Sequence, residues 1–399
     1  GSNTTGAENT AIGGSALRVE TDGNRNTALG YASLYSGVSI SDNTAIGART
    51  LLSNTSGGNN TAVGSYALNA NTTASNNTAV GYQAGYSNQT GGYLTALGWK
   101  AGYASTGDYN TFIGGNSAVS NTSGTANVTL GTSALYNNTT GAANVGVGGT
   151  WSGNVNGALI NNTTGNYNTA IGREALNNNT TASNIVAVGY QAAYSNTTGV
   201  RNTAHGYQAG YSNSTSDYNT ATGYQTLFTN TGAYNTAVGA LAMYANTTGT
   251  ENIAVGVSAL DSNTTGSYNT VIGTSALQAN TTASNNTAVG YQAGYSNTTG
   301  TQNNFFGTQA GYSSTTDNQA FFGYQAGYNT TTGTQNTVMG GYRPFYSNTT
   351  GAYNTVFGSQ ALYSNTTASY NTAVGYQAGY ANTTGTITAV GAYSLLANT

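Results

Sequence analysis

Apolar and polar positions recur along this chain at a nearly fixed spacing, and that spacing organises every other observation. The motif Asn-Thr-Ala-Val-Gly stands at 60–64, 77–81, 286–290 and 371–375, and variants of it recur throughout the sequence. Its glycine marks 23 anchor positions from Gly13 to Gly391, and 16 of the 22 intervals between them are 17 residues long. A short, fixed period across a whole chain is the signature of a solenoid or a repeat array.

A 17-residue coil is too short for a strand, a helix and two turns, but it suits short strands joined by tight turns. Gly and Asn interrupt every apolar run, so helices would end before they nucleate. We therefore predict an all-β fold, a β-solenoid (parallel β-roll or β-helix) of about 23 coils with a 17-residue repeat. We expect residues 1–399 to form one continuous solenoid domain, with a loop insertion near 149–160, where one interval grows to 24 residues.

Two alternate positions of the motif predict the core. The residue before the anchor glycine is apolar in 21 of 23 coils, and Thr stands two residues earlier in 17 coils. Alternate residues of a strand share a face, so we predict that both point inward. The predicted core stripe includes Val63, Val80, Val238, Val255, Ile272, Val289 and Val374. The residue between them would then point outward, and there Phe112, Phe305 and Phe321 form a candidate assembly face.

Asparagine recurs at two places in the coil. Four residues before the anchor it stands in 19 coils, which predicts a hydrogen-bonded ladder that includes Asn60, Asn77, Asn235, Asn269, Asn286 and Asn371. Seven residues after the anchor it opens Asn-Thr-Thr-Gly, which is turn chemistry and also the N-x-[ST] acceptor. We expect these turns on an exposed corner, with candidate glycosylation at Asn71, Asn138, Asn196, Asn246, Asn263, Asn280, Asn297, Asn348, Asn365 and Asn382.

Tyrosine recurs five residues after the anchor in 12 coils, and more tyrosines stand one after and five before it. Coils about 4.8 Å apart would stack such rings along the solenoid axis. The structural interpretation is stacking alone, and the functional alternative is an aromatic strip that binds sugar.

Composition removes several classes of function. Charged residues make up 4% of the chain, and seven Lys plus Arg against ten Asp plus Glu provide no basic stripe, so no nucleic-acid partner is predicted. No apolar run reaches 18 residues, so membrane insertion is not predicted. The first residue is not Met and the last coil is incomplete, so we expect a processed chain or a piece of a longer one.

Groups that could carry catalysis or hold a metal are few. Cys is absent, and the one histidine, His205, stands at a predicted inward position with Thr222 at the same place in the next coil. We interpret these two as a buried, hydrogen-bonded pair. The ten acids share no position in the repeat, so we predict no enzyme, no metal and no cofactor. Within the insertion, Trp151 is the candidate for a specific contact.

The repeat resembles known surface proteins. Asn-Thr-Ala-Val-Gly is similar to the head repeats of trimeric autotransporter adhesins, and 202–209 and 356–367 resemble the Asn-Thr-Ala-x-Gly arrays of bacterial surface and phage tail-fibre-like proteins. That resemblance covers nearly every coil. It implies a left-handed parallel β-roll, a homotrimer in the adhesin case, and an adhesive or fibrous role at the cell surface.

Three functions follow from these observations. The leading hypothesis is an extracellular structural fibre or adhesin shaft that assembles with itself as a fibre, parallel bundle or trimer. The second is a surface that binds ice or glycans through Thr or Tyr ladders; ice binding would need outward Thr columns, and the Thr column is predicted to face inward. The third is the shaft of a phage tail fibre.

Overall fold

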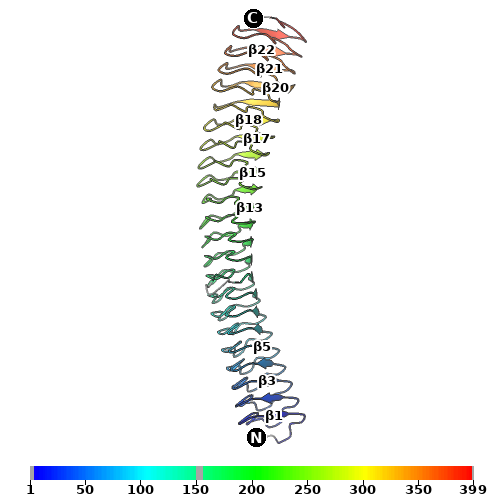
Figure 1. The fold of residues 1–399 in the computed structure, drawn as a ribbon, viewed down its shortest axis with the longest axis vertical. Helices are drawn as coiled ribbons and strands as arrows, with labels where there is room; N and C mark the ends of the chain where they lie inside the picture. The colour runs from blue at the N-terminus through cyan, green and yellow to red at the C-terminus, as the bar shows by residue number, and fades with distance from the viewer. Residues whose placement is uncertain (1–3, 150–155, 398–399) are drawn as a thin grey trace. The chain divides into compact units, whose positions relative to one another are not determined.

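Short parallel strands, one in each repeat, make up the fold. The computed structural model describes residues 4–149 and 156–397, and within these residues every regular element is a β-strand. The chain divides into two compact units, Gly1–Asn202 and Thr203–Thr399, and in each unit the strands stack in chain order (Figure 1). The predicted β-solenoid is therefore confirmed. The expectation of one continuous domain stays a prediction.

The described residues of the first unit form eleven strands. They are β1 (Thr10–Ile12), β2 (Thr27–Leu29), β3 (Thr44–Ile46), β4 (Thr61–Val63), β5 (Thr78–Val80), β6 (Thr95–Leu97), β7 (Thr111–Ile113), β8 (Val128–Leu130), β9 (Val145–Val147), β10 (Thr169–Ile171) and β11 (Val186–Val188).

In the second unit, residues 203–397 form twelve strands. They are β12 (Thr203–His205), β13 (Thr220–Thr222), β14 (Thr236–Val238), β15 (Ile253–Val255), β16 (Thr270–Ile272), β17 (Thr287–Val289), β18 (Asn304–Phe306), β19 (Ala320–Tyr324), β20 (Thr337–Tyr342), β21 (Thr355–Phe357), β22 (Thr372–Val374) and β23 (Thr388–Val390).

The anchor glycine has a steric reason to be glycine in every coil. Gly81, directly after β5, has a φ of 134°, a region that side chains disfavour. A Cβ added there would lie 2.4 Å from the carbonyl oxygen of Gly98 in the next coil. The close approach lets neighbouring strands pair in register, with Thr78 beside Thr95 and Val80 beside Leu97.

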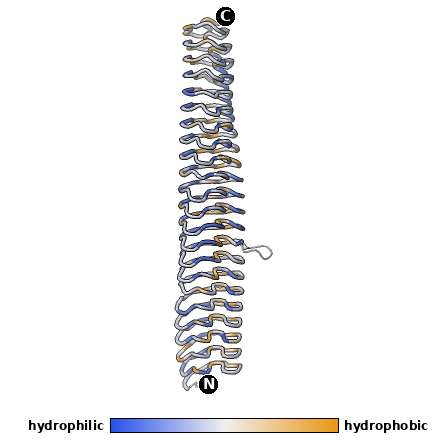
Figure 2. Tube along the Cα trace, turned by 90° about the vertical axis from the view of Figure 1, so that its left-hand side faces the viewer, coloured by the Kyte–Doolittle hydropathy of each residue, from blue (hydrophilic) through white to orange (hydrophobic). Residues whose placement is uncertain are grey.

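The core lies on the opposite side of the strands from the predicted one. The middle residue of each strand is buried, as Ala79, Ala237 and Ala288 are, each with no exposed surface. Alanine three residues after the anchor and leucine at the fourth complete the interior; Ala259 and Leu260 are an example. Residues of similar hydropathy recur at the same place in successive coils of each unit (Figure 2).

The predicted core stripe is therefore wrong. Its members point outward: Val80, Val238, Val255, Ile272 and Val374 are 36–44% exposed, while Val63 and Val289 are half-buried. The physical reason is space. Strand and turn face each other across a narrow interior that is densely packed, so the strand most often contributes alanine there and leaves the larger residue before the anchor outside.

The candidate assembly face is corrected by the same observation. Phe112, Phe305 and Phe321 have no exposed surface, so they cannot meet another subunit. Each phenylalanine takes the space that a leucine fills in other coils, and glycine stands at the leucine position nearby. A Cβ at Gly102 would lie 2.6 Å from the Phe112 ring, and one at Gly327 would lie 2.4 Å from the Phe321 ring.

The long interval between Gly148 and Gly172 begins and ends as an ordinary coil. The strands β9 and β10 on either side of it pair in register, with Thr169 beside Val145. The backbone N–H of Leu135 donates to the carbonyl of Ala158 at 2.9 Å, the bond that other coils make to the alanine three residues after the anchor. Trp151, the candidate contact residue, lies outside the described residues.

Candidate functional site

The first predicted asparagine ladder is present, buried and bonded between coils. The side-chain oxygen of Asn252 accepts hydrogen bonds from the backbone N–H and the amide of Asn269, at 3.0 and 3.1 Å. The amide of Asn269 also donates to the carbonyl of Ala283 at 2.9 Å. The other five asparagines predicted for this ladder are likewise buried and bonded to a neighbouring coil: Asn60, Asn77, Asn235, Asn286 and Asn371.

The Asn-Thr-Thr-Gly turns hold a second asparagine ladder, which the sequence analysis missed. The amide of Asn263 donates to the side-chain oxygen of Asn246 at 2.7 Å and to the carbonyl of Gly266 at 2.9 Å. The side-chain oxygen of Asn263 accepts from the amide of Asn280 at 2.8 Å. The hydroxyl of Thr264 donates to the carbonyl of Thr281 in the next coil at 3.0 Å, so these turns bind coil to coil.

The predicted glycosylation corner is wrong for this reason. A glycan needs an accessible side-chain amide, and the amides at these turns are turned inward and engaged in hydrogen bonds. All ten candidate asparagines have no exposed surface: Asn71, Asn138, Asn196, Asn246, Asn263, Asn280, Asn297, Asn348, Asn365 and Asn382.

The outward side of the strands forms a regular surface in each unit. It carries two columns, threonine at the start of the strand and an apolar residue at its end, and we call this surface the outer strand face. In β16, Thr270 is half-buried and Ile272 is 44% exposed; in β5, Val80 is 39% exposed. The threonine column faces the solvent, which corrects the predicted inward orientation.

Tyrosine columns stack as the structural interpretation predicts. Tyr295, Tyr312, Tyr328, Tyr346, Tyr363 and Tyr380 form one continuous run with ring centroids 4.9–5.3 Å apart. Burial in this run raises the pKa of Tyr328, with a smaller contribution from Tyr312 and Tyr346. Stacked rings cover one another's faces, so within such a run a sugar would meet only ring edges and hydroxyls. This geometry argues against an aromatic sugar-binding strip there.

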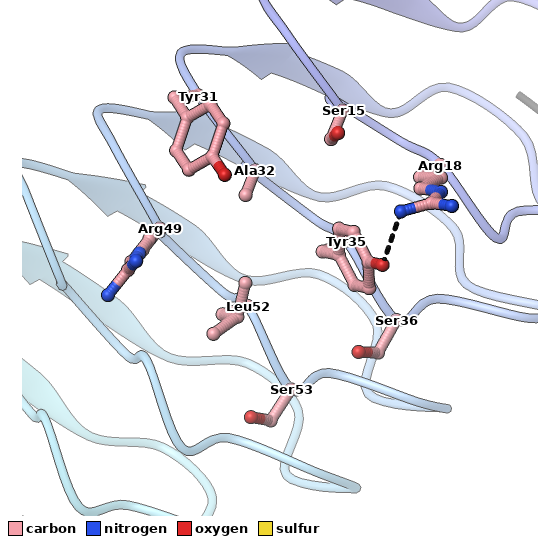
Figure 3. A pocket seen from close by; sticks show the side chains of 9 residues that line it. All are labelled: Ser15, Arg18, Tyr31, Ala32, Tyr35, Ser36, Arg49, Leu52 and Ser53. Atoms are coloured by element: carbon pink, nitrogen blue, oxygen red, sulfur yellow. Dashed lines mark hydrogen bonds between the residues drawn. The ribbon is translucent and has the colours of Figure 1, made fainter.

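One open pocket interrupts these columns near the start of the first unit. It has a volume of about 410 Å³ (Figure 3), within the range of small-ligand sites. Its lining comprises Ser15, Arg18, Tyr31, Ala32, Tyr35, Ser36, Arg49, Leu52 and Ser53.

Two arginines stand at opposite edges of this pocket (Figure 3). A guanidinium nitrogen of Arg18 donates to the hydroxyl of Tyr35 at 2.7 Å, and Arg49 donates to the hydroxyl of Tyr66 at 3.2 Å. In the described part of the chain, ion pairs form elsewhere, between Arg25 and Asp42 and between Arg173 and Glu174. Both pocket arginines therefore keep a positive charge that no carboxylate in the described residues neutralises.

The prediction that His205 and Thr222 form a buried, hydrogen-bonded pair is wrong as well. His205 ends β12 on the outer strand face, where its side chain is exposed, and Thr222 beside it in β13 is half-buried. Across residues 4–149 and 156–397, no three His, Asp or Glu side chains gather as metal ligands would. The described residues also contain no helix with the length and apolarity that a membrane crossing requires.

Comparison with known proteins does not place the chain in a family. No protein-family model matches the sequence, and no curated protein matches it.

Proposed function

We propose that this chain is a structural repeat protein, the shaft of an extracellular fibre or adhesin, and that copies of it associate with one another. The observation that carries the proposal is how the repeated polar residues are used. Both asparagine ladders and the Asn-Thr-Thr-Gly hydroxyls bond one coil to the next, as Asn263 and Thr264 do. Polar residues that recur in nearly every coil and make hydrogen bonds inside the solenoid support a mechanical role. The resemblance to adhesin heads and tail-fibre arrays points the same way.

The outer strand face suits the proposed self-association. Its apolar column leaves branched side chains uncovered at regular intervals, among them Val238, Val255 and Ile272, which are 36–44% exposed. A formal net charge of −3 over 399 residues opposes contact between copies only weakly. Two such faces in contact would bury both apolar columns, which is favourable at about 25 cal/mol per Å².

The test is mass measurement in solution across a concentration series. We expect assemblies of several copies from the unaltered chain, and single chains of 40.3 kDa from the variant Val238→Lys, Val255→Lys, Ile272→Lys. These three side chains already contact water, so the variant keeps its fold; circular dichroism checks this. Thr265→Lys, on an exposed turn, is the matched control and should assemble normally. A monomer at every concentration for the unaltered chain would contradict self-association.

Ice binding is the second candidate, because the threonine column turns out to face the solvent. Threonines of neighbouring strands stand in register, as Thr61 does beside Thr78, on a surface with strands about 4.8 Å apart. A rigid, flat array of methyl and hydroxyl groups at such spacing can order surface water into an ice-like layer. The second column is apolar here, so only one of the two columns is threonine.

Thermal hysteresis separates this candidate from the shaft. An ice-binding face would depress the freezing point below the melting point, and Thr270→Glu together with Thr287→Glu would abolish the effect. Freezing and melting at the same temperature for the unaltered chain would eliminate ice binding and leave the shaft proposal intact.

A further inference from the structure

The pocket between Arg18 and Arg49 exists because two side-chain columns stop there. Elsewhere the second residue after the anchor is often a glutamine bonded to the next one, as Gln225 is to Gln208 at 2.9 Å. In the pocket that column holds the small residues Ser15 and Ala32. Their short side chains leave open the space that a glutamine side chain would occupy.

The aromatic column stops at the same place. The fifth residue after the anchor is tyrosine in 12 coils, and Tyr86 and Tyr103 show the usual stacking at 5.0 Å. In the pocket this position is held by Arg18, Tyr35 and Leu52 in turn, so Tyr35 has no aromatic ring at its own position in either adjacent coil. Both departures from the repeat fall within the same three coils.

From this arrangement we infer that the pocket binds an acidic monosaccharide, a sugar ring that carries a carboxylate. The guanidinium groups of Arg18 and Arg49 supply the charge. Each makes one hydrogen bond to a tyrosine hydroxyl, and a guanidinium has five N–H donors, so donors remain for a ligand. Arginine pairs with carboxylate through charge-assisted, often bidentate bonds.

Tyr31 supplies the apolar surface for the sugar ring. Its side chain is 59% exposed, and in the described residues it makes no ring contact of the kind that joins Tyr207 to Tyr224. The neighbours at the same position in adjacent coils are Gly14 and Ala48, which are too small to cover the ring. An uncovered aromatic face packs against the C–H side of a sugar.

Hydroxyl groups around the rim of the pocket are suited to bind the hydroxyl groups of a sugar. Ser15, Ser36 and Ser53 line the pocket, and each can donate and accept a hydrogen bond. Sugar hydroxyls need both kinds of partner. A nucleic acid is a poorer fit, because binding to its backbone needs a row of cations and this surface offers two. The inference does not depend on the shaft proposal, since the pocket lies on turns and not on the outer strand face.

The experiment is titration calorimetry of the full chain with three probes: D-glucuronate, D-glucose and inorganic sulfate. Glucuronate should bind at least about tenfold more tightly than glucose, because glucose lacks the charge that the arginines recognise. It should also bind more tightly than sulfate, which has the charge but no ring for Tyr31. Equal affinities for glucuronate and glucose, or no binding of glucuronate, would overturn the inference. Equal affinities for glucuronate and sulfate would overturn its sugar part.

Variants locate the binding without risking the fold. Arg49→Gln, Arg18→Tyr and Tyr31→Ala each install a residue type that other coils carry at that position. Each should weaken glucuronate binding about tenfold or more, and Tyr31→Ala should leave sulfate binding unchanged. Lys100→Gln is the matched control, because Lys100 occupies the position of Arg49 in another coil and lies outside the pocket. Equal losses in Lys100→Gln and Arg49→Gln would show that net charge, and not the pocket, attracts the ligand.

Discussion

Phe305 and Gly311 offer a direct test of how the interior is packed. Phe305 is fully buried in β18, and a Cβ at Gly311 would lie 2.3 Å from its ring. Some coils with alanine in the strand carry leucine at the position of Gly311; Ala254 with Leu260 is one such pair. The two pairs are alternative fillings of one space, so the substitutions Phe305→Ala and Gly311→Leu should compensate each other.

The magnitudes follow from burial and overlap. Phe305→Ala should cost about 3–5 kcal/mol, the usual range for a buried phenylalanine. Gly311→Leu alone should cost about 1–3 kcal/mol from overpacking and about 1 kcal/mol more from the left-handed backbone, where φ is 60°. Leu260 adopts nearly the same φ, 55°, so that position accepts leucine when space allows. Independent effects would sum to about 5–9 kcal/mol in the double variant.

We expect the double variant to be more stable than Phe305→Ala alone. The assay is chemical unfolding of the full chain, with hydrogen exchange to follow the local coils. Exchange at the backbone amides of residues 294 and 311 measures the stability of these coils, because the two amides donate to the carbonyls of Ala310 and Ala326 at 2.9 Å each. If the double variant lost the sum of the two single losses, strand and turn would not share one space and the packing argument would fail.

Three further predictions test the inward side, the second ladder and one ion pair. Ala288→Asp should destabilise the chain by more than about 4 kcal/mol while Val289→Asp costs much less, because only the first buries a charge; equal melting temperatures would contradict this orientation. Asn263→Ala should cost about 3 kcal/mol in chemical unfolding, because it leaves buried partners in two coils unsatisfied. A hydrogen bond from Arg25 holds the pKa of Asp42 below its usual range, so this bond stabilises at neutral pH and is lost as pH falls through the lowered pKa. An NMR titration should show the pKa of Asp42 return toward its usual range in Arg25→Gln.

The period was enough to predict the fold, because a 17-residue repeat with regular glycines permits few other architectures. The position of each strand could also be predicted, since Gly81 and its equivalents fix where one coil ends. What the pattern left open was which side of the strand faces inward. Hydrophobicity favoured Val80 over Ala79, but the middle residue of the strand is the one that faces the interior, and there alanine leaves room for the side chains of the turn.

The candidate sites also differed in how far the sequence could predict them. The first asparagine ladder could be predicted because an asparagine repeated beside a strand has an obvious partner in the next coil, as Asn269 has in Asn252. The second ladder has the composition of an exposed turn, and only the three-dimensional path shows that Asn263 points inward. The pocket could have been found by asking where Gln and Tyr are missing from their usual positions, as at Ala32 and Leu52.

A repeat protein can recognise a partner in two physically different ways. A column that is the same in most coils, such as the threonines of the outer strand face, offers a lattice, and it can only match another lattice such as ice or a second copy. A single small molecule needs a place that differs from its surroundings, because a surface that is identical in every coil offers no preferred position. Arg18 and Arg49 meet that condition, since both replace the commoner residue of their column. Different variants therefore test the shaft and the pocket. Lysines on the outer strand face should abolish assembly and leave glucuronate binding intact, whereas Arg49→Gln should weaken glucuronate binding and leave assembly intact.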